Sequence, residues 1–359
     1  MIISSLTTSE ASQVIGLSVT LLCWKKRSYG AFFLLLMPLL VACSEARREV
    51  VFLGQTMGTT YSVKYLSNDD PEFVVNEVGV AKLLDYLDAM LSTYQYDSEL
   101  NRLNRTPVGE DFAVSPMFWQ LLLISQRVFE QTDGAFDPTI GPLVDLWGFG
   151  PSEREDSIPS PLEINSLLTT VGYQHLEFLP TAQSVRKELA IRIDLSAIAK
   201  GFAAEQVAAM LVEQGVENYL VEVGGEIRAA GINGRGEPWA IAIEVPALAR
   251  GQVQKVIELN DHGVATSGDY RNYFERDGLR YSHTIDPRTG YPISHRLASV
   301  TVVADDAAEA DALATAYMVM GVEQALALAR RDKVAAYFLV RNDTGFIEYS
   351  SDTFAEQFE

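Results

Sequence analysis

The order of strand-like and helix-like segments constrains the fold of this chain most strongly. Glu49–Leu66 is rich in β-branched and aromatic residues and contains Met57-Gly58, which predicts one or two strands with a turn. Helical periodicity follows over Pro71–Thr93, and Ser115–Gln131 predicts a second helix capped by Ser115. Because strand pairs alternate with single helices and no G-x-G-x-x-G occurs, we predict an α+β fold of mixed, largely antiparallel sheets with packed helices, not a Rossmann sheet.

The remaining segments continue this alternation. Leu189–Gly215 predicts a strand up to Leu195 and then a helix, and Gly224-Gly225 lies inside a strand pattern, which signals a bulge or a close backbone approach. The alanine-rich stretch 305–316 predicts a helix that continues past Gly321. Further strands are expected at Trp239–Val245, Gln254–Leu259, Leu279–Ile285, Ser299–Val303 and 334–341. Irregular segments are expected at Ser92–Asn104, Asp133–Gly150 and Pro151–Pro161, the last followed by a short helix to Val171.

The N-terminus has the pattern of a bacterial lipoprotein leader. Basic residues at 25–27 precede the apolar run Ala31–Ala42, and Leu-Val-Ala-Cys ends at Cys43. A positive start, a short apolar run and small residues at the cut are typical of a secretory signal. We therefore expect a periplasmic protein that is anchored through a lipid on Cys43, to the inner rather than the outer membrane. The alternative is an ordinary signal peptide with a chance cysteine, and a translation start downstream of Met1 also stays open.

The length of the chain bounds its domain organisation, and its net charge bounds its partners. The chain has 359 residues, is 48% hydrophobic and has a net charge of −20 at pH 7. We divide it into a signal peptide (1–42), a lipidated tether (43–48), one functional domain (49–345) and a C-terminal tail (346–359). The acidic excess argues against nucleic acid as a partner, because phosphate binding requires clustered Lys and Arg. Cleavage before Cys43 would also remove Cys23, so we expect no disulfide.

Asp194 and Lys200 are the first candidate site residues. Asp194 is expected at a strand end and Lys200 in the first turn of the following helix. A lysine there faces the positive end of the helix dipole, and an anion bound at the helix start would remove this conflict. The alternatives are an ion pair between the two residues or a solvated Lys200.

His283 and Asp286 are candidates for acid or base chemistry. They lie in "YSHTIDPRTGYPI", after an apolar strand pattern, and Asp-Pro-x-Thr-Gly is itself a turn signal. The alternative is an ordinary turn with a hydrogen-bonded histidine. In "TSGDYRNYF", Gly268, its neighbouring hydroxyls and Arg271 are suited to phosphate or ribose contacts.

Asp311 and Thr315 are four residues apart in the alanine-rich helix and share one face. Two oxygens are too few for a closed metal site, but they suit a Mg²⁺ ion shared with a substrate phosphate. The alternative is an exposed Asp311 with Thr315 bonded back to its carbonyl.

Taken together, these segments resemble the bacterial flavin transferase family, the ApbE-like FAD:protein FMN transferases, also described as thiamine-biosynthesis lipoproteins. The resemblance runs from about Gly54 to Val340. It rests on "TMGTTY", "STYQYDSELNRLN", "GAFDPTIGPLVDLWGF", "IDLSAIAKGFAAE", "VEVGGEIRAAG", "TSGDYRNYF", "SHTIDPRTGYP" and "ADALATAYMVMG", in this order. The resemblance implies the ApbE-like (T-fold-like) flavin transferase fold over 49–345.

The resemblance also implies the site and the reaction. It implies FAD contacts at Met57, Tyr94, Ala135, Phe136, Asp137, Asp194, Lys200 and Ile285. It implies Mg²⁺ ligands in the backbone oxygen of Ala197 and the side chains of Asp311 and Thr315. The implied reaction transfers FMN from FAD to a Ser or Thr hydroxyl of a flavin-carrying, periplasm-facing subunit of a membrane redox complex and releases AMP. His283 is the first choice of base and Asp286 the second. FAD hydrolysis to FMN and AMP, or FAD binding without chemistry, are the alternatives.

Overall fold

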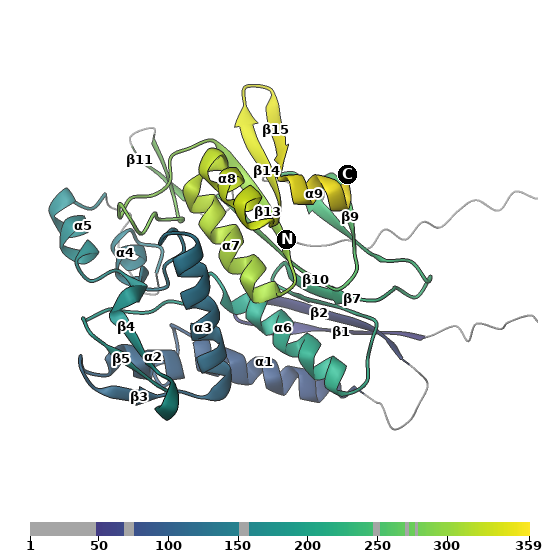
Figure 1. Cartoon of the computed structure of the whole chain (residues 1–359), viewed down its shortest axis with the longest axis horizontal. Helices are drawn as coiled ribbons and strands as arrows, with labels where there is room; N and C mark the ends of the chain where they lie inside the picture. The colour runs from purple at the N-terminus through teal and green to yellow at the C-terminus, as the bar shows by residue number, and fades with distance from the viewer. Residues whose placement is uncertain (1–47, 68–74, 151–157, 247–251, 270–272, 277–278) are drawn as a thin grey trace, which may run out of the picture. The chain divides into compact units, whose positions relative to one another are not determined.

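An eight-stranded antiparallel sheet is the centre of the fold (Figure 1). The computed structural model describes residues 48–67, 75–150, 158–246, 252–269, 273–276 and 279–359. The strands follow the order β1 (Arg48–Thr56), β2 (Thr59–Ser67), β6 (Tyr219–Val223), β7 (Glu226–Ala230), β10 (His262–Gly268), β13 (Leu297–Ala304), β14 (Ala335–Asn342) and β15 (Gly345–Ser350). All neighbours in this order pair antiparallel, which confirms the predicted α+β class.

Three smaller antiparallel sheets accompany the large one. They are β3 (Asp111–Ala113), β5 (Ser184–Lys187) and β4 (Leu176–Leu179); β8 (Trp239–Glu244) and β9 (Val253–Leu259); and β11 (Tyr273–Arg276) and β12 (Leu279–Ser282). The β11–β12 hairpin matters for function, because the chain that leaves it carries His283.

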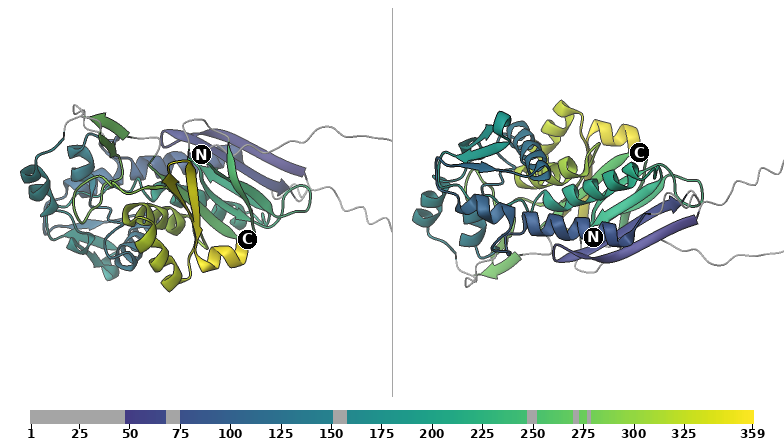
Figure 2. Two further views of the ribbon diagram at one scale, coloured as in Figure 1. Left: turned by 90° about the horizontal axis from the view of Figure 1, so that it is seen from above. Right: turned by 90° about the horizontal axis from the view of Figure 1, so that it is seen from below.

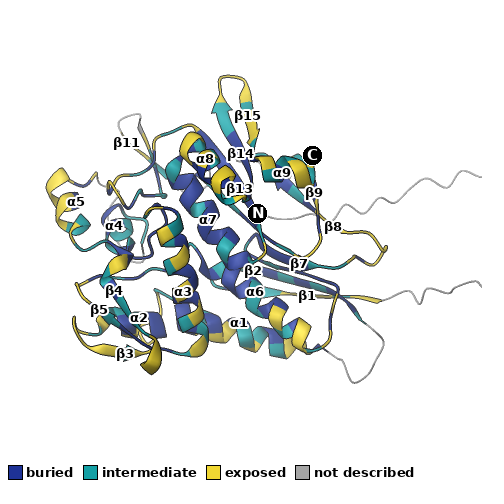
Figure 3. Cartoon of the chain, in the orientation of Figure 1, coloured by how far each residue is buried: buried dark blue, intermediate teal, exposed yellow. Residues whose placement is uncertain are grey.

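Two alanine-rich helices form the layer next to the large sheet. The helices are α1 (Glu77–Leu91), α2 (Glu99–Arg105), α3 (Pro116–Gln131), α4 (Gly141–Leu146), α5 (Pro161–Leu168), α6 (Ala199–Glu213), α7 (Ala307–Met320), α8 (Val322–Asp332) and α9 (Asp352–Phe358). Helix α6 packs against β6 and β7, and α7 packs against β10 and β13 (Figures 1 and 2). Most of α7 is buried, since α3 covers its other side (Figure 3).

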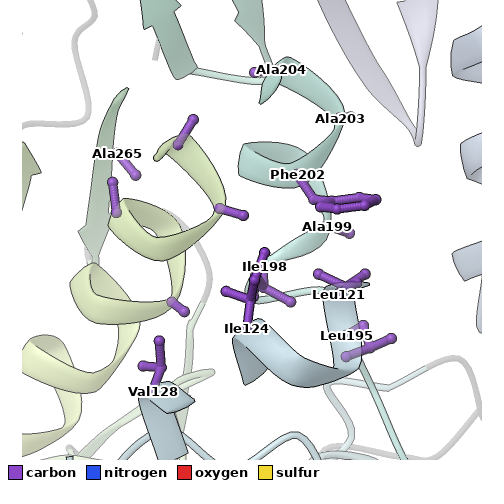
Figure 4. Close-up of a cluster of buried hydrophobic side chains, with 14 of the residues drawn as sticks. Leu121, Ile124, Val128, Leu195, Ile198, Ala199, Phe202, Ala203, Ala204 and Ala265 are labelled. Carbon is purple, nitrogen blue, oxygen red and sulfur yellow. The ribbon is translucent and has the colours of Figure 1, made fainter. Parts of the chain in front are cut away.

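Small side chains let α6 and α7 approach closely. Gly201 in α6 faces the first turn of α7, where an added Cβ would lie 2.8 Å from the carbonyl carbon of Ala307 and 2.7 Å from Cβ of Asp311. Larger apolar groups, among them Phe202 and Ile198, fill the space toward α3 (Figure 4). This contact fixes the start of α6 against the first two turns of α7.

Several local predictions were wrong. Residues expected as a polar turn form α2, whose Ser98 accepts a hydrogen bond from the Asn101 backbone and caps the helix. The strand expected at Leu189–Leu195 is only a single bridge between Ile140 and Arg192, and β10 was not predicted. The expected single helix breaks at Gly321, whose φ of 75° ends α7 before α8 begins.

The predictions for the glycine turns at Gly58 and at Gly224-Gly225 agree better with the structure. Met57 and Gly58, with φ of 48° and 70°, form the two-residue turn of the β1–β2 hairpin, as predicted. Gly224 and Gly225, with φ of 62° and 108°, form the turn between β6 and β7, so of the two alternatives, a bulge or a close approach, the bulge is ruled out. The expected close approach at this point is confirmed, because an added Cβ at Gly224 would meet Lys200 Cδ at 2.9 Å.

The residues expected as a C-terminal tail belong to this fold. Strand β15 pairs with β14, and α9 buries Phe354 against Tyr337, with ring centroids 5.2 Å apart. The predicted signal peptide, Cys43 and the tether up to residue 47 lie outside the described residues, as do Arg271 and the linker residues 151–157. Among the helices that the structure describes, none combines the length and apolarity needed to cross a bilayer.

Candidate functional site

A cleft of about 540 Å³ gathers most of the predicted site residues. Its walls come from the segment after α1, the loop before α4, the start of α6, the β6–β7 turn, β10, the segment after β12 and the inner face of α7. The predicted residues that line it are Tyr94, Ala135, Phe136, Asp137, Asp194, Ala197, Lys200, His283, Ile285, Asp311 and Thr315.

Lys200 lines the cleft and lies between two buried carboxylates. Its Nζ is 3.4 Å from Oε2 of Glu226 and 3.7 Å from Oδ2 of Asp311. The same Asp311 oxygen accepts a hydrogen bond of 3.0 Å from the Gly201 backbone, at the start of α6. The helix dipole favours a carboxylate at this position. Lys200 lies at the positive end of the α6 dipole, and its ion pairs with Glu226 and Asp311 offset this unfavourable position. The predicted alternative of an ion pair with Asp194 is therefore wrong.

Burial shifts the protonation equilibria of this cluster. It raises the pKa of Glu226 to about 8, although Lys200 opposes the shift. It also raises the pKa of Asp311, again against the attraction of Lys200. Burial alone would lower the pKa of Lys200, but the Asp311 and Glu226 carboxylates outweigh it and raise this pKa overall. Above about pH 8, where Glu226 is also ionised, the cluster has one more negative than positive charge, which favours an additional cation.

Asp311 and Thr315 meet the cleft from the same face of α7. Asp311 is only 3% exposed, so the alternative of a solvated carboxylate is wrong. The Thr315 hydroxyl lies 3.3 Å from the Ser267 hydroxyl on β10. Carboxylate, hydroxyl and backbone oxygens are the donors that Mg²⁺ prefers, and the donor set of Ala197, Asp311 and Thr315 fits this ion. No group of three or more His, Cys, Asp or Glu side chains in the described segments could hold a metal. The donors therefore fit an ion that shares its shell with a substrate.

The loop before α4 places one buried carboxylate in the cleft wall. Asp137 accepts hydrogen bonds from the Thr139 hydroxyl at 2.7 Å and the Thr139 backbone at 2.8 Å. Burial raises the pKa of Asp137, and these hydrogen bonds limit the shift. Asp194 lies alongside, where its backbone N–H donates to Pro138 O at 2.6 Å and its carboxylate accepts from Ser196. The loop and the α6 start thus form one continuous wall.

Aromatic side chains support His283 at the other side of the cleft. Phe149 meets the His283 ring edge-on, with centroids 6.3 Å apart. Phe149 also stacks on Phe274 of β11 at 5.5 Å, and Phe274 stacks on Tyr281 of β12 at 5.0 Å. Edge-on and offset contacts of this kind favour fixed ring positions. The aromatic stack therefore connects the β11–β12 hairpin, the loop after α4 and His283.

Two predicted residues lie elsewhere, and one was missed. Met57 lines a separate hollow beside α1, together with Asp85. The Asp286 carboxylate is held by Arg288, whose Nε and Nη2 donate at 2.9 and 2.8 Å, and it does not line the cleft. Glu226 lines the cleft but was not among the predicted site residues, although the close approach signalled by Gly224-Gly225 directly precedes it.

A cleft with buried, pKa-shifted charges and aromatic lining residues is typical of an enzyme active site. A family model described as the ApbE family matches residues 57–338, and the chain belongs to this family. Proteins named "FAD:protein FMN transferase" are similar to it. The one from Vibrio cholerae is 44% identical over 320 residues, covering 88% of this chain and 95% of the relative. The one from Escherichia coli K12 is 40% identical over 316 residues, covering 87% and 90%.

Solved structures of flavin transferases are also similar to this chain. Flavin transferase ApbE from Vibrio cholerae matches with a TM-score of 0.79 and 42% identity, covering 87% of this chain and 100% of that one. The apo form of Pseudomonas stutzeri flavinyl transferase ApbE matches with a TM-score of 0.80 and 45% identity, covering 87% and 97%. The predicted family and the predicted ApbE-like fold are therefore confirmed.

Proposed function

We propose that this protein transfers the FMN moiety of FAD to a Ser or Thr hydroxyl of a partner flavoprotein, in a Mg²⁺-dependent reaction that releases AMP. One observation carries the proposal: a cleft in an ApbE family member holds Lys200 between Glu226 and Asp311, with Thr315 beside them and aromatic walls above. Such a site matches an ionic pyrophosphate between two flat ring systems.

In the proposed reaction, the acceptor hydroxyl oxygen forms a bond to the phosphorus of the riboflavin phosphate. The pyrophosphate P–O bond to AMP breaks, and AMP leaves with the bond's electron pair. His283 takes the hydroxyl proton, since it lines the cleft, whereas Asp286 is already bound by Arg288. Because phosphoryl transfer depends on positioning and charge neutralisation, Lys200 contributes by holding a positive charge near the phosphates.

The residues Ala197, Asp311 and Thr315 would hold the Mg²⁺ ion. When bound, Mg²⁺ neutralises phosphate charge and polarises the bond to the leaving group. The apolar side chains of Phe136 and Ile285 line the cleft and would exclude water from the rings of FAD.

We further propose that a lipid on Cys43 anchors the protein at the periplasmic face of the inner membrane. The support is the Leu-Val-Ala-Cys sequence after a basic and apolar leader. The acceptors would then be periplasm-facing, flavin-carrying subunits of membrane redox complexes, because these lie within reach of an anchored enzyme.

The test is to incubate the protein with FAD, Mg²⁺ and a candidate acceptor, and to measure in-gel flavin fluorescence together with AMP. We expect a fluorescent acceptor band and an equal amount of AMP, and Asp311→Ala should abolish both. AMP without a labelled band would show that the enzyme hydrolyses FAD, and neither product would show that it only binds FAD. Full activity of Asp311→Ala would disprove the metal assignment.

A further inference from the structure

Glu226 is a buried acidic residue in the cleft to which no role has been given so far. It is the first residue of β7, and its side chain is 7% exposed. In the described part of the chain, its Oε2 accepts no hydrogen bond, and Lys200 Nζ is its ion-pair partner at 3.4 Å. Lys200 is shared with Asp311, so a single ammonium compensates two buried carboxylates, and burying the second carboxylate costs free energy. We therefore expect the Glu226 carboxylate to have a function in the cleft.

The geometry shows a competition for the ammonium of Lys200. Nζ lies at similar distances from Glu226 and Asp311, 3.4 and 3.7 Å. The β6–β7 turn limits the room for the lysine stem, since an added Cβ at Gly224 would lie 2.9 Å from its Cδ. An ammonium that pairs with Asp311 repels a divalent cation there, because both are positive and approach the same carboxylate.

We propose that Glu226 is a positioning residue, which competes with Asp311 for the Lys200 ammonium and thereby weakens the Lys200–Asp311 pair, so that Asp311 binds a divalent cation more readily. The proposal rests on the proposed function, since it concerns the same metal ligand. In this arrangement Glu226 separates the contact of Lys200 with phosphate from the binding of the metal by Asp311. Lys200 stays close enough to meet phosphate, and Asp311 keeps its charge for the metal.

Metal binding can be measured without the reaction. Mn²⁺ serves as the probe, because the electron paramagnetic resonance signal of the free ion reports how much is bound to the full chain, without FAD. We expect Glu226→Gln to weaken Mn²⁺ binding about tenfold and Glu226→Asp to restore most of it. Glu205→Gln is the matched control, since Glu205 is a partly buried carboxylate that pairs with Arg228 outside the cleft. The glutamine oxygen can still accept the hydrogen bond that Glu205 accepts from the Ala307 backbone, so this change should leave Mn²⁺ binding unchanged.

A double-variant cycle separates positioning from simple loss of negative charge. With Lys200→Met, the ammonium is gone, so adding Glu226→Gln should change Mn²⁺ binding less than twofold. An equal loss in both backgrounds would overturn the proposal, as would unchanged binding by Glu226→Gln or absence of Mn²⁺ binding by the unmodified protein. Thermal unfolding identifies a variant that fails to fold. If Glu226→Gln fails to fold, the effect of Glu226→Asp on Mn²⁺ binding is compared with and without Lys200→Met instead.

The proposed function can fail independently of this inference. A protein that binds Mn²⁺ with the expected dependence on Glu226, but labels no acceptor and releases no AMP, would disprove the transfer reaction and support the role of Glu226. A protein that labels its acceptor, but shows the same Mn²⁺ binding with and without Glu226→Gln, would do the reverse.

Discussion

Replacing Gly201 by Ala tests whether the close approach of α6 and α7 builds the site. The new methyl would lie 2.7 Å from Cβ of Asp311 and closer still to the Ala307 carbonyl oxygen, so the helices must separate by more than about 0.7 Å to reach ordinary contact at 3.4 Å. Such overpacking costs about 1–3 kcal/mol. The strained hydrogen bond from the Gly201 backbone to Asp311 adds about 1 kcal/mol, and the better helix propensity of Ala returns about 1 kcal/mol.

The net destabilisation is therefore about 2 kcal/mol, which lowers the melting temperature by roughly 3 °C in a domain of about 300 residues. Because Asp311 moves with α7, we also expect turnover at 25 °C to fall at least tenfold, where the variant is still folded. Calorimetry and the flavin-transfer assay measure the two effects.

Gly79→Ala is the matched control. Gly79 is also the third residue of its helix, α1, but its added Cβ would meet only the flexible end of Met210, at 2.9 Å. We expect unchanged or slightly raised stability and full activity. If Gly201→Ala is as stable and as active as Gly79→Ala, the close contact of α6 and α7 does not position Asp311.

Three further changes test other parts of the molecule. Asp286→Asn should keep most activity, because this carboxylate is bound by Arg288 outside the cleft. His283→Ala should lower kcat about 100-fold or more at neutral pH, because it removes the proposed base. Equal losses of kcat in the two variants would contradict the choice of His283 over Asp286. Burial lowers the pKa of His262, so the unfolded state binds more protons below about pH 6.5 and stability falls on acidification; His262→Gln should reduce this slope in urea titrations at pH 5 and 8, and an unchanged slope would contradict it. Phe354→Ala should cost about 3–5 kcal/mol, since the ring is fully buried, and a loss below 1 kcal/mol in urea unfolding would show that α9 is a dispensable tail.

Much of the fold could be predicted because local patterns carry it. The Met57-Gly58 turn, the capped helix after Ser115 and the alanine-rich helix all follow from residue preferences that act within a few positions. Helix α2 could not be predicted from its polar sequence, since contacts with residues distant in the sequence stabilise it. One of them is the hydrogen bond of 2.8 Å from Asn104 to the Ile193 carbonyl.

The site was predicted where motifs bring residues together and missed where tertiary contacts decide. The resemblance placed Lys200, Asp311 and Thr315, and the structure brings them into one cleft. The sequence could not show that Glu226 reaches Lys200, because this pair depends on β7 lying beside α6. Nor could it show that Arg288 folds back onto Asp286 and removes it from the cleft.

The central claim is that the protein joins FMN to an acceptor hydroxyl, and mass spectrometry of the acceptor tests it most directly. After incubation with FAD and Mg²⁺, we expect a mass gain equal to FMN minus water on a single Ser or Thr peptide, matched by one AMP per modified acceptor. The gain should vanish when that Ser or Thr is replaced by Ala, and with Asp311→Ala in the enzyme. An unmodified acceptor with AMP in solution, or a flavin lost on denaturation, would contradict the claim.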